Sequence, residues 1–499
     1  MFSKLFPLIL AAVAPIAQTA DALSAREPVS QADETPLVFA HFMIGVVSNR
    51  ASASDYDDDM QRAKSLGIDA FALNIGTDPF TDTQLQYAYE SAAKNDVKVF
   101  ISFDFNWWDP SSQAAEIGEM AKQYGSLPAQ LMVDNKTFVS SFAGDELDVA
   151  ALRESAGGDI FFAPNFHPEL GTDFSTVDGA LNWMAWPNDG NNKAPKSGAN
   201  VTVEEGDTDF LEALGNNNYI APVSPWFFTH FGPEVSYSKN WVFPSDLLWF
   251  DRWNEILQLQ PRFIEIITWN DYGESHYIGP LSSRHTDDGS SKWVNDMPHG
   301  GLLDMAKPYI AAYHDGASSV DSYIEEDQVI YWYRRTKRDL DCDATDTTMQ
   351  PANNDTGNYF QGRPNGWETM QDSVFVVTML TEAGELTVAS GDNTEVLDAP
   401  AGAKAFAVDM GLGKQSFSLS RGGESALSGD SLMEITDVCP CGLYNFNPYV
   451  GSLPSQEPDA LDSDGLAAFM EGLKVTTCSP TPTLGAGTPP TSTPTSAGQ

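Results

Sequence analysis

The sequence predicts a (β/α)₈ TIM barrel followed by an accessory β-sandwich domain. From Leu37 onward, apolar runs typical of strands alternate with helical patterns, as in βα units around a parallel sheet. This alternation continues to about residue 317, and about 250 to 300 residues is the usual span of such a barrel. After about Ser318 the helical signals fade, and short alternating segments follow, separated by Gly, Asn, Asp and Pro turns.

Eight strands and eight helices make up the predicted barrel. The expected strands are Leu37–Met43, Ala70–Asn74, Val97–Phe105, Gln130–Val133 continuing through Phe138–Phe142, Ile160–Asn165, Leu181–Trp186, Tyr219–Phe227 and Phe263–Trp269. The expected helices are Asp55–Leu66, Asp82–Asn95, Ser111–Tyr124, Asp148–Glu154, Val177–Ala180, Asp207–Leu214, Pro244–Leu257 and Leu302–Tyr313.

Five domain segments follow from these patterns: a signal peptide (1–22), an N-terminal extension (23–36), the catalytic barrel (37–317), the β-sandwich (318–478) and a Pro/Thr/Ser-rich tail (479–499). The strands predicted for the sandwich are Val329–Arg334, Ser373–Leu380, Glu385–Ala389, Ala403–Val408 and Gln415–Ser420. The composition of the tail cannot form a core, and we expect it to be O-glycosylated.

The N-terminus has the pattern of a secretory signal. Lys4 supplies the positive charge, an apolar run follows to Ala17, and Ala20-Asp21-Ala22 is a small-x-small cleavage site, so we expect a secreted protein that starts near Leu23. N-glycosylation triplets at Asn135, Asn200 and Asn354 agree with export. No later stretch is long and apolar enough to span a bilayer.

The net charge of the chain limits the classes of molecule that it is expected to bind. There are 70 acidic and 27 basic residues, for a net charge of −43 with His neutral. Such a field repels nucleic acid and anionic membranes, so neither is an expected partner. The chain also contains 12 Trp, 16 Tyr and 28 Phe, which suit stacking on neutral sugar rings, although most aromatic residues in any protein are core. A neutral polysaccharide substrate and a monomeric protein are therefore expected.

All four cysteines lie in the last third of the chain: Cys342, Cys439, Cys441 and Cys478. In an oxidising compartment they predict two disulfides with three possible pairings, which the sequence leaves open. A Cys-x-Cys pair can also bind metal, but no histidine lies near this one, so we expect no metal site there.

The stretch Phe263 to Ser275 predicts the catalytic centre. It begins as an apolar, β-branched strand and ends abruptly in polar residues, among them Asp271 and Glu274. Gly273 is expected to provide backbone freedom for a tight turn that holds the two carboxylates together. In TIM barrels the carboxyl ends of the strands bear the chemistry, so this is the place for catalytic acids. Asp104, at the end of the third strand, is a third candidate.

The same rim argument gives the candidate substrate-binding residues, which are acids, amides, histidines and tryptophans at or after strand ends. They are His41, Asn74, Trp107, Trp108, Asp145, Glu146, Asn165, His167, Trp186, Trp226, His230, Trp269, Asn270 and His276. An acid in a rim loop also serves as a helix cap or a solvated surface group, and a rim histidine can simply be hydrogen-bonded.

These features favour glycoside hydrolysis, which needs one carboxylic acid to protonate the leaving oxygen and one carboxylate to act as base or nucleophile. Metal-dependent hydrolysis is disfavoured because no HxH or HExxH pattern is present, and no GxSxG elbow supports serine-based acyl transfer. No cofactor is expected. A general acid of the carboxyl type also predicts an acidic pH optimum.

Several motifs resemble glycoside hydrolase family 71, the fungal endo-1,3-α-glucanases or mutanases. They are PLVFAHFMIG, ISFDFNWW, SFAGDE, SPWFFTHFG, ITWNDYGESHYIGP and CPCGLYNFNPYVG. The shorter Trp-Asn-acid-x-Gly-Glu core is also similar to a motif of barrel endo-mannosidases. The resemblance implies a secreted barrel with a β-sandwich that cleaves α-1,3-glucan with inversion and without a cofactor. It places the essential acids at Asp271, Glu274 and Asp104, and our assignment is Glu274 as general acid with Asp271 or Asp104 as general base.

Two alternatives remain open at this point. One is a glycoside hydrolase that acts on another polymer, mannan or a β-glucan. The other is a wall protein that binds α-glucan without cleaving it, although a binding protein has no need of three acids at one rim.

Overall fold

The computed structural model describes residues 35–215, 218–232, 238–346, 362–455 and 459. The predicted signal peptide and the Pro/Thr/Ser-rich tail lie outside these residues. The described residues from Pro36 onward belong to one compact unit. None of its described helices has both the length and the apolar character that a bilayer crossing requires.

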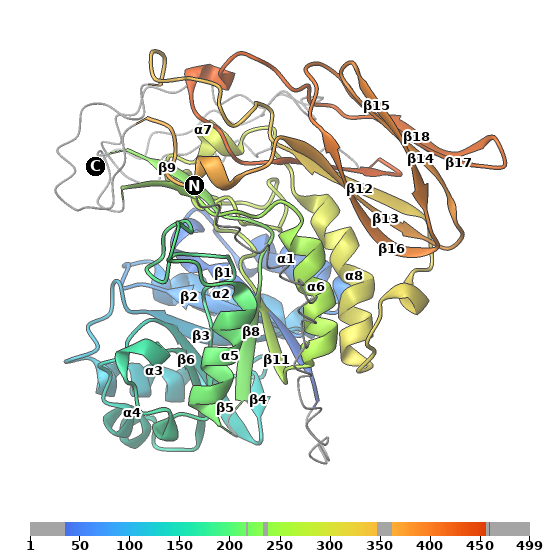
Figure 1. Ribbon diagram of the computed structural model, residues 1–499. Coiled ribbons are helices and arrows are strands. Elements are labelled where there is room, and N and C mark those ends of the chain that lie inside the picture. The colour runs from blue at the N-terminus through green and yellow to red at the C-terminus, as the bar shows by residue number, and fades with distance from the viewer. Residues whose placement is uncertain (1–34, 216–217, 233–237, 347–361, 456–458, 460–499) are drawn as a thin grey trace, which may run out of the picture. The chain divides into compact units, whose positions relative to one another are not determined.

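A curled parallel sheet forms the N-terminal part of this unit (Figure 1). Its eight parallel strands pair in the order β6-β5-β3-β2-β1-β11-β8-β7. Their bounds are β1 Leu37–Met43, β2 Ala70–Ile75, β3 Lys98–Asp104, β5 Lys136–Phe142, β6 Ile160–Asn165, β7 Gly179–Leu181, β8 Asn218–Val223 and β11 Phe263–Ile266. A short antiparallel strand, β4 (Met132–Val133), joins β5 through a hairpin, so the predicted fourth strand is a hairpin rather than one continuous strand.

The two ends of the pairing order, β6 and β7, approach each other without forming a strand ladder in the described residues. Asp178 links them, because its N–H donates to Phe162 O at 2.9 Å and its carboxylate accepts from Phe162 N at 3.0 Å. Eight parallel strands are thus present in the expected order, but the predicted sixth strand, Leu181–Trp186, is wrong, since β7 overlaps it only at Leu181. Complete closure into a barrel is not confirmed by this pairing.

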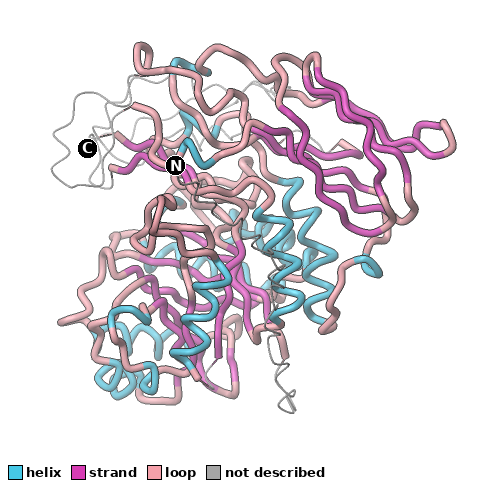
Figure 2. Tube along the Cα trace, viewed as in Figure 1, coloured by secondary structure: helices cyan, strands magenta, loops and turns pink. Residues whose placement is uncertain are grey.

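Helices cover the outer face of the sheet (Figure 2). They are α1 Asp57–Leu66, α2 Thr81–Asn95, α3 Ala114–Gly125, α4 Val149–Ala156, α5 Val203–Leu214, α6 Leu248–Leu259 and α8 Gly300–His314. The short helix α7 (Ser291–Val294) instead packs through Trp293 on Phe228 and Phe231. The helix predicted at Val177–Ala180 is wrong, since this segment leads into β7. Asp178 fixes that segment through ion pairs with Lys136 and Arg153 as well as its bonds to Phe162.

Aromatic side chains fill the amino-terminal half of the sheet's inner face. Phe39 packs on the rings of Phe100, Phe138 and Phe263 with centroid separations of 5.0 to 5.5 Å. The alternate residues of the same strands pack outward against the helices in a second core. Both faces are therefore largely dry, which explains the nearly continuous apolar strands.

Two antiparallel four-stranded sheets form the C-terminal part, as expected for a β-sandwich. One sheet has the order β16-β13-β12-β19 and the other β15-β14-β17-β18. Their bounds are β12 Gln328–Tyr333, β13 Ser373–Leu380, β14 Gly384–Ser390, β15 Asn393–Ala399, β16 Gly402–Asp409, β17 Gln415–Arg421, β18 Glu424–Asp430 and β19 Tyr449–Leu453. Three of these strands, β15, β18 and β19, were not predicted.

Strand β12 is apolar on both faces for a specific reason. Tyr331 stacks on Phe417 at 3.8 Å inside the sandwich, whereas Trp332 belongs to the core shared with α8. At the start of α8, a Cβ added to Gly301 would lie 3.0 Å from Val450 Cγ1, so glycine allows this close approach.

One disulfide joins Cys342 to Cys439, with a Cα–Cα distance of 5.9 Å. Cys441 is also disulfide-bonded, and Cys478 lies outside the described residues. The predicted disulfide bonding is therefore confirmed for the three cysteines that the structure describes.

Candidate active site

The chain beyond β11 folds back on itself and places the two predicted catalytic acids. Thr268 N donates to His276 O and Ile278 N donates to Thr268 O, both at 3.0 Å, so residues 269–275 form a closed loop. Trp269 N donates to His41 O at 2.7 Å, which fixes the base of this loop to β1. The strand itself ends at Ile266, three residues earlier than predicted.

Asp271 and Glu274 face each other across this loop. Asp271 N donates to Thr268 Oγ1 at 2.9 Å, and Glu274 N donates to Asp271 Oδ1 at 3.1 Å. One carboxylate oxygen of each acid and one ring nitrogen of His276 lie within 4.8 Å of one another. Both acids are half-buried, so a ligand can reach them.

The structural role of Gly273 differs from the predicted one, which was to give the turn its backbone freedom. Its φ is not positive, so its backbone freedom is not what the loop requires. A Cβ at this position would instead lie 2.7 Å from Asp288 Oδ2 and 3.1 Å from the Phe231 ring. Glycine is needed at position 273 because the Asp288 carboxylate and the Phe231 ring leave no room for a side chain.

His276 is fully buried and serves Glu274. Its Nε2 lies 2.9 Å from Glu274 Oε2, and its Nδ1 lies 3.1 Å from Thr268 Oγ1. Burial lowers the pKa of His276 to about 4, so the ring is neutral near pH 7. The neutral ring that fits these contacts accepts from the Thr268 hydroxyl and donates from Nε2 to Glu274. The indole of Trp186 stacks on the imidazole at 5.3 Å and holds its plane.

Lys239 is the principal residue that sequence reasoning missed. It lies on β10 (Lys239–Val242), which pairs with β9 (Phe228–Phe231) in a hairpin after β8. Its ammonium group forms an ion pair with Glu274, and its side chain is 23% exposed. Burial lowers the pKa of Lys239, and the negative charges of Asp271, Asp288 and Asp104 oppose that change.

Asp104 ends β3 and is almost completely buried, with 7% of the residue exposed. Burial raises the pKa of this carboxyl, partly offset by the N–H of Asn106 at 2.9 Å and by the charges of His41 and Lys239. The environments of Asp104 and Glu274 therefore differ: burial favours the protonated form of Asp104, whereas Lys239 and His276 both donate to the carboxylate of Glu274.

Asp288, also missed, is the fourth acid of this group. Burial raises its pKa to about 7, and the nearby charges of Asp287 and Asp271 act in the same direction. Ser290 N donates to Asp288 Oδ1 at 3.0 Å, so the carboxylate also supports the start of α7.

A histidine–glutamate pair lies inside the sheet below these acids. His41 Nδ1 on β1 contacts Glu265 Oε1 on β11 at 2.7 Å, and both side chains are fully buried. Among the described residues, His41 Nε2 and Glu265 Oε2 have no hydrogen-bond partner. Trp183 lies edge-on to His41 at 4.7 Å and to His276 at 6.5 Å. Glu265 and Trp183 were not predicted, because Glu265 lies within an apolar strand and Trp183 within a segment predicted as strand.

Five predicted binding residues use their polar atoms to hold the protein together. Trp269 donates to Asp59, Trp226 to Ser275 O and Trp108 to Ile75 O, while Asn270 bonds the backbone of Met43 and Asn165 that of Ala143 and Leu181. These side chains are buried. Their positions support the rim, and their contact with substrate stays a prediction.

The remaining predicted binding residues differ in burial and in hydrogen bonding. His230 is buried between Asn240 Oδ1 at 2.7 Å and Asp346 Oδ2 at 2.6 Å. Asp145 accepts from His167 and Thr172, and these bonds outweigh its burial and lower its pKa, while the pKa of His167 rises. Asn74 is buried, whereas Glu146 is exposed and Trp107 is 60% exposed.

Asp271, Glu274 and His276 are close enough together to chelate a metal ion. The ammonium group of Lys239 lies against Glu274, however, and its positive charge opposes a second cation at this position. The arrangement suits proton transfer better than metal binding.

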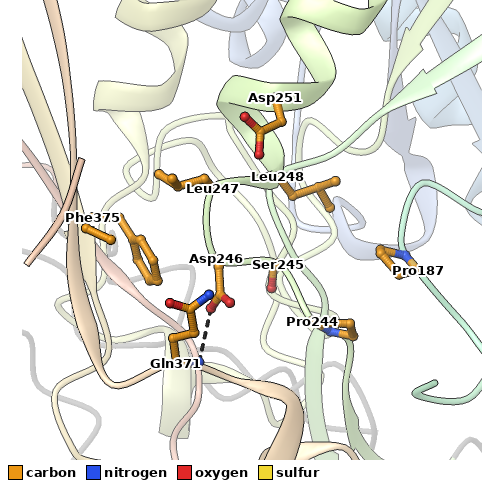
Figure 3. A pocket seen from close by; sticks show the side chains of 10 residues that line it. Pro187, Pro244, Ser245, Asp246, Leu247, Leu248, Asp251, Gln371 and Phe375 are labelled. Carbon is orange, nitrogen blue, oxygen red and sulfur yellow. Dashed lines mark hydrogen bonds between the residues drawn. The ribbon is translucent and has the colours of Figure 1, made fainter. Parts of the chain in front are cut away.

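A separate cavity of about 300 Å³ lies beside the start of α6 (Figure 3). It is lined by Pro187, Pro244, Ser245, Asp246, Leu247, Leu248, Asp251, Gln371, Phe375 and Ala407. Asp246 accepts a hydrogen bond from Gln371 N at 3.2 Å, and Trp332 donates to Asp246 O. None of the four acids contributes to this cavity, so it is not the candidate active site.

Comparison with known proteins identifies what this chain is similar to. The model of glycosyl hydrolase family 71 matches residues 34–462. A mutanase from Penicillium rubens is 44% identical over 457 residues, which cover 91% of this chain and 95% of that protein. The glucan endo-1,3-alpha-glucosidase agn1 of Schizosaccharomyces pombe is 37% identical over 436 residues, 84% of this chain and 94% of that protein. An ascus wall endo-1,3-alpha-glucanase of the same yeast is 29% identical over 337 residues, 63% and 75% of the two chains.

Proposed function

We infer that this protein is an endo-1,3-α-glucanase, because the chain belongs to glycosyl hydrolase family 71. The names of its relatives support α-1,3-glucan as the substrate. The observation that carries the proposal is the meeting of Asp104, Asp271 and Glu274 around Lys239, beyond the carboxyl ends of a parallel sheet. We propose that this sheet works as a (β/α)₈ barrel, in which that rim is the place for catalysis.

The chemistry requires one protonated and one ionised carboxyl group at the scissile bond. Burial of Asp104 favours its protonated form, whereas the donors from Lys239 and His276 favour the ionised form of Glu274. In the unliganded site these contacts support Asp104 as general acid and Glu274 as general base, the reverse of the assignment made from the resemblance. Asp271 would then stabilise the positive charge that develops on the sugar ring.

A substrate with a good leaving group separates these roles, because a glycosyl fluoride needs no general acid. On a fluoride of an α-1,3-linked glucose oligomer, Asp104→Asn should keep most of its activity and Glu274→Gln should lose it. The opposite pattern would restore Glu274 as the acid.

Inversion of the anomeric centre is the proposed stereochemistry. An inverting pair is separated by about 6.5–9.5 Å to admit a water molecule, and a retaining pair by about 5–5.5 Å. Oxygen atoms of Asp271 and Glu274 approach within 4.8 Å, so Asp104, from another strand, is the better candidate for the distant partner. Proton NMR of the first product should show the β-anomer. An α-anomer would contradict inversion and favour Asp271 as a nucleophile.

Release of reducing sugar from insoluble α-1,3-glucan tests the function, with β-1,3-glucan, dextran and α-mannan as controls. Selective release by the wild-type protein, lost in Asp271→Asn and Glu274→Gln variants that still fold, would support the proposal. Release from a control polymer instead would favour a different linkage. Sedimentation with the glucan without any release would favour the binding-protein alternative.

Secretion is part of the same proposal, since it depends on the predicted signal at residues 1–22. Expression in a fungal host should place the protein in the medium or wall, with an N-terminus near Leu23. Recovery inside the cell with Met1 intact would contradict it.

A further inference from the structure

The hairpin formed by β9 and β10 places one cation among the four acids of the candidate active site. Lys239 opens β10 and forms its ion pair with Glu274, 35 residues further along the chain. Phe228 N on β9 donates to Glu274 O at 3.0 Å, so the hairpin holds the backbone of Glu274 as well as its carboxylate. The β9–β10 hairpin therefore both fixes the position of Glu274 and supplies the positive charge that pairs with it.

Several charged or titratable groups face Lys239. Asp271 and Asp288 come from the segment after β11, Asp104 from the end of β3, and Lys193 from the segment after β7. The neutral ring of His276 lies on the other oxygen of Glu274. Four carboxyl groups thus share the field of Lys239, and Lys193 is directed over the Trp241 ring at 3.8 Å from its centroid.

We propose that Lys239 is a positioning residue for the hydrolysis: its ammonium group keeps Glu274 ionised in the empty site and thereby sets the lower pH limit of activity. The inference rests on the proposed function for its kinetic readout, but the protonation of Glu274 can be measured without any turnover.

The physical reason is the repulsion among the acids. Without the lysine, Glu274 would lie beside Asp271 with only a neutral histidine as donor, and like charges at this distance favour uptake of a proton. With the lysine, the ion pair favours the carboxylate, and an opposite charge at contact lowers the pKa of an acid by about 1 to 3 units. The base would therefore stay ionised at the mildly acidic pH at which a carboxylic acid can still donate.

A purely structural role makes a different prediction. If Lys239 only anchored the hairpin, any long side chain would serve and the pH dependence would not move. Charge and length can be separated with Lys239→Met, which keeps the length without the charge, and Lys239→Arg, which keeps the charge. Lys414→Met is a matched control, because Lys414 pairs with Asp430 on the sandwich and is 56% exposed.

The first experiment is carbodiimide labelling of carboxyl groups as a function of pH, since the reagent attacks the protonated form. Trypsin releases residues 263–284 as one peptide, which contains Glu265, Asp271 and Glu274, and fragment spectra locate the label. In Lys239→Met, the pH midpoint for labelling of Glu274 should rise by about 1 unit or more, while Lys239→Arg and Lys414→Met should follow the wild type. Fully buried Glu265 serves as an internal control.

The second experiment is the pH profile of kcat/KM, which reports the free enzyme. The acid limb of Lys239→Met should shift upward by the same amount, which is about a tenfold loss at pH values below both limbs, with recovery in Lys239→Arg. Unchanged labelling in folded Lys239→Met, or an equal shift in Lys239→Arg, would overturn the proposal. If no polymer is cleaved by the wild type, the proposed function fails, and the labelling midpoint still decides the part of Lys239.

Discussion

Two buried clusters of acid and base in this protein differ in how their charges are matched. In the first, Arg252 on α6 is fully buried and its guanidinium binds both oxygens of Asp207 on α5, at 2.6 and 2.8 Å. Its Nε donates to Pro222 O at 2.9 Å, and Tyr219 donates to Asp207 Oδ1. Arg252 also contacts Glu255 at 3.2 Å. Asp207 is the bidentate partner, as expected of an ion pair that holds helices to a sheet.

The second cluster, at the carboxyl end of the sheet, is unbalanced. Lys239 pairs with Glu274 and shares its field with Asp271, Asp288 and Asp104, and burial raises the pKa values of Asp104 and Asp288. Such a group is costly to fold and easy to protonate, which suits catalysis rather than support. The difference teaches that a bidentate pair with fully bonded groups marks the structural cluster, whereas one ammonium group shared by four acids marks the chemical one.

The largest effect should come from removing one charge of the unbalanced cluster. Asp271→Asn and Glu274→Gln should each lower kcat by about 10³-fold or more, because a group required for proton transfer or charge stabilisation is lost. The thermal midpoint should stay near that of the wild type, because each amide keeps an acceptor oxygen for the bond that its carboxylate makes, from the Glu274 N–H to Asp271 or from Lys239 to Glu274. Reducing-sugar assays and calorimetry on the same samples measure both.

An isosteric change in the Arg252–Asp207 cluster should lower stability and leave activity nearly unchanged. Asp207→Asn removes the bidentate partner of fully buried Arg252 and leaves it only the 3.2 Å contact with Glu255, which costs on the order of 3 kcal/mol of unfolding free energy. Activity per folded molecule should remain near that of the wild type. Urea denaturation measures the loss, with Asp209→Asn on the exposed side of the same helix as control. A stable but inactive Asp207→Asn would show that the two clusters are not separate in function.

Asp288 should make the unbalanced cluster less stable as the pH rises. Its folded pKa, about 7, lies above the ordinary value of 3.8, so the folded state holds a proton that the unfolded state has released. The stability that this group contributes is present below about pH 4 and is lost as the pH rises through about 7. Asp288→Asn should flatten that slope and add on the order of 1 kcal/mol at pH 8.

Thermal unfolding between pH 4 and pH 8 measures this effect. Asp209→Asn is the control, because this exposed acid lies on α5, outside the unbalanced cluster, and its loss should leave the wild-type slope unchanged. An Asp288→Asn variant whose stability has the same pH dependence as that of the wild type would contradict the raised pKa of Asp288.

The smallest effect should come from an exposed, matched pair. Lys414 and Asp430 are both more than half exposed on the outer sheet of the sandwich. Lys414→Met should change the unfolding free energy by less than about 0.5 kcal/mol, and 1 M NaCl should remove even that difference. A larger loss would mean that solvent-exposed pairs matter more in this sandwich than the matched-charge comparison allows.

The fold was largely predictable from the sequence because its signals are local. Strands β1 and β6 have the predicted bounds, since both are apolar runs that are buried on two faces. The segment before β7 was not predictable, because Asp178 holds it in place through Phe162, Lys136 and Arg153. Its conformation depends on partners 16 to 42 residues away.

The sequence by itself determined the strand order, the acidic loop after β11 and the family resemblance, all of which lie in contiguous residues. Only the tertiary structure decided which groups surround those acids. The residues Lys239, Asp288 and Glu265 have no distinguishing local pattern in the sequence. Their roles follow from contacts between distant segments: Lys239 contacts Glu274, and Asp288 lies close to Gly273. Glu265 contacts His41 on the neighbouring strand. Protonation depends on burial and nearby charge, and both are properties of the folded chain.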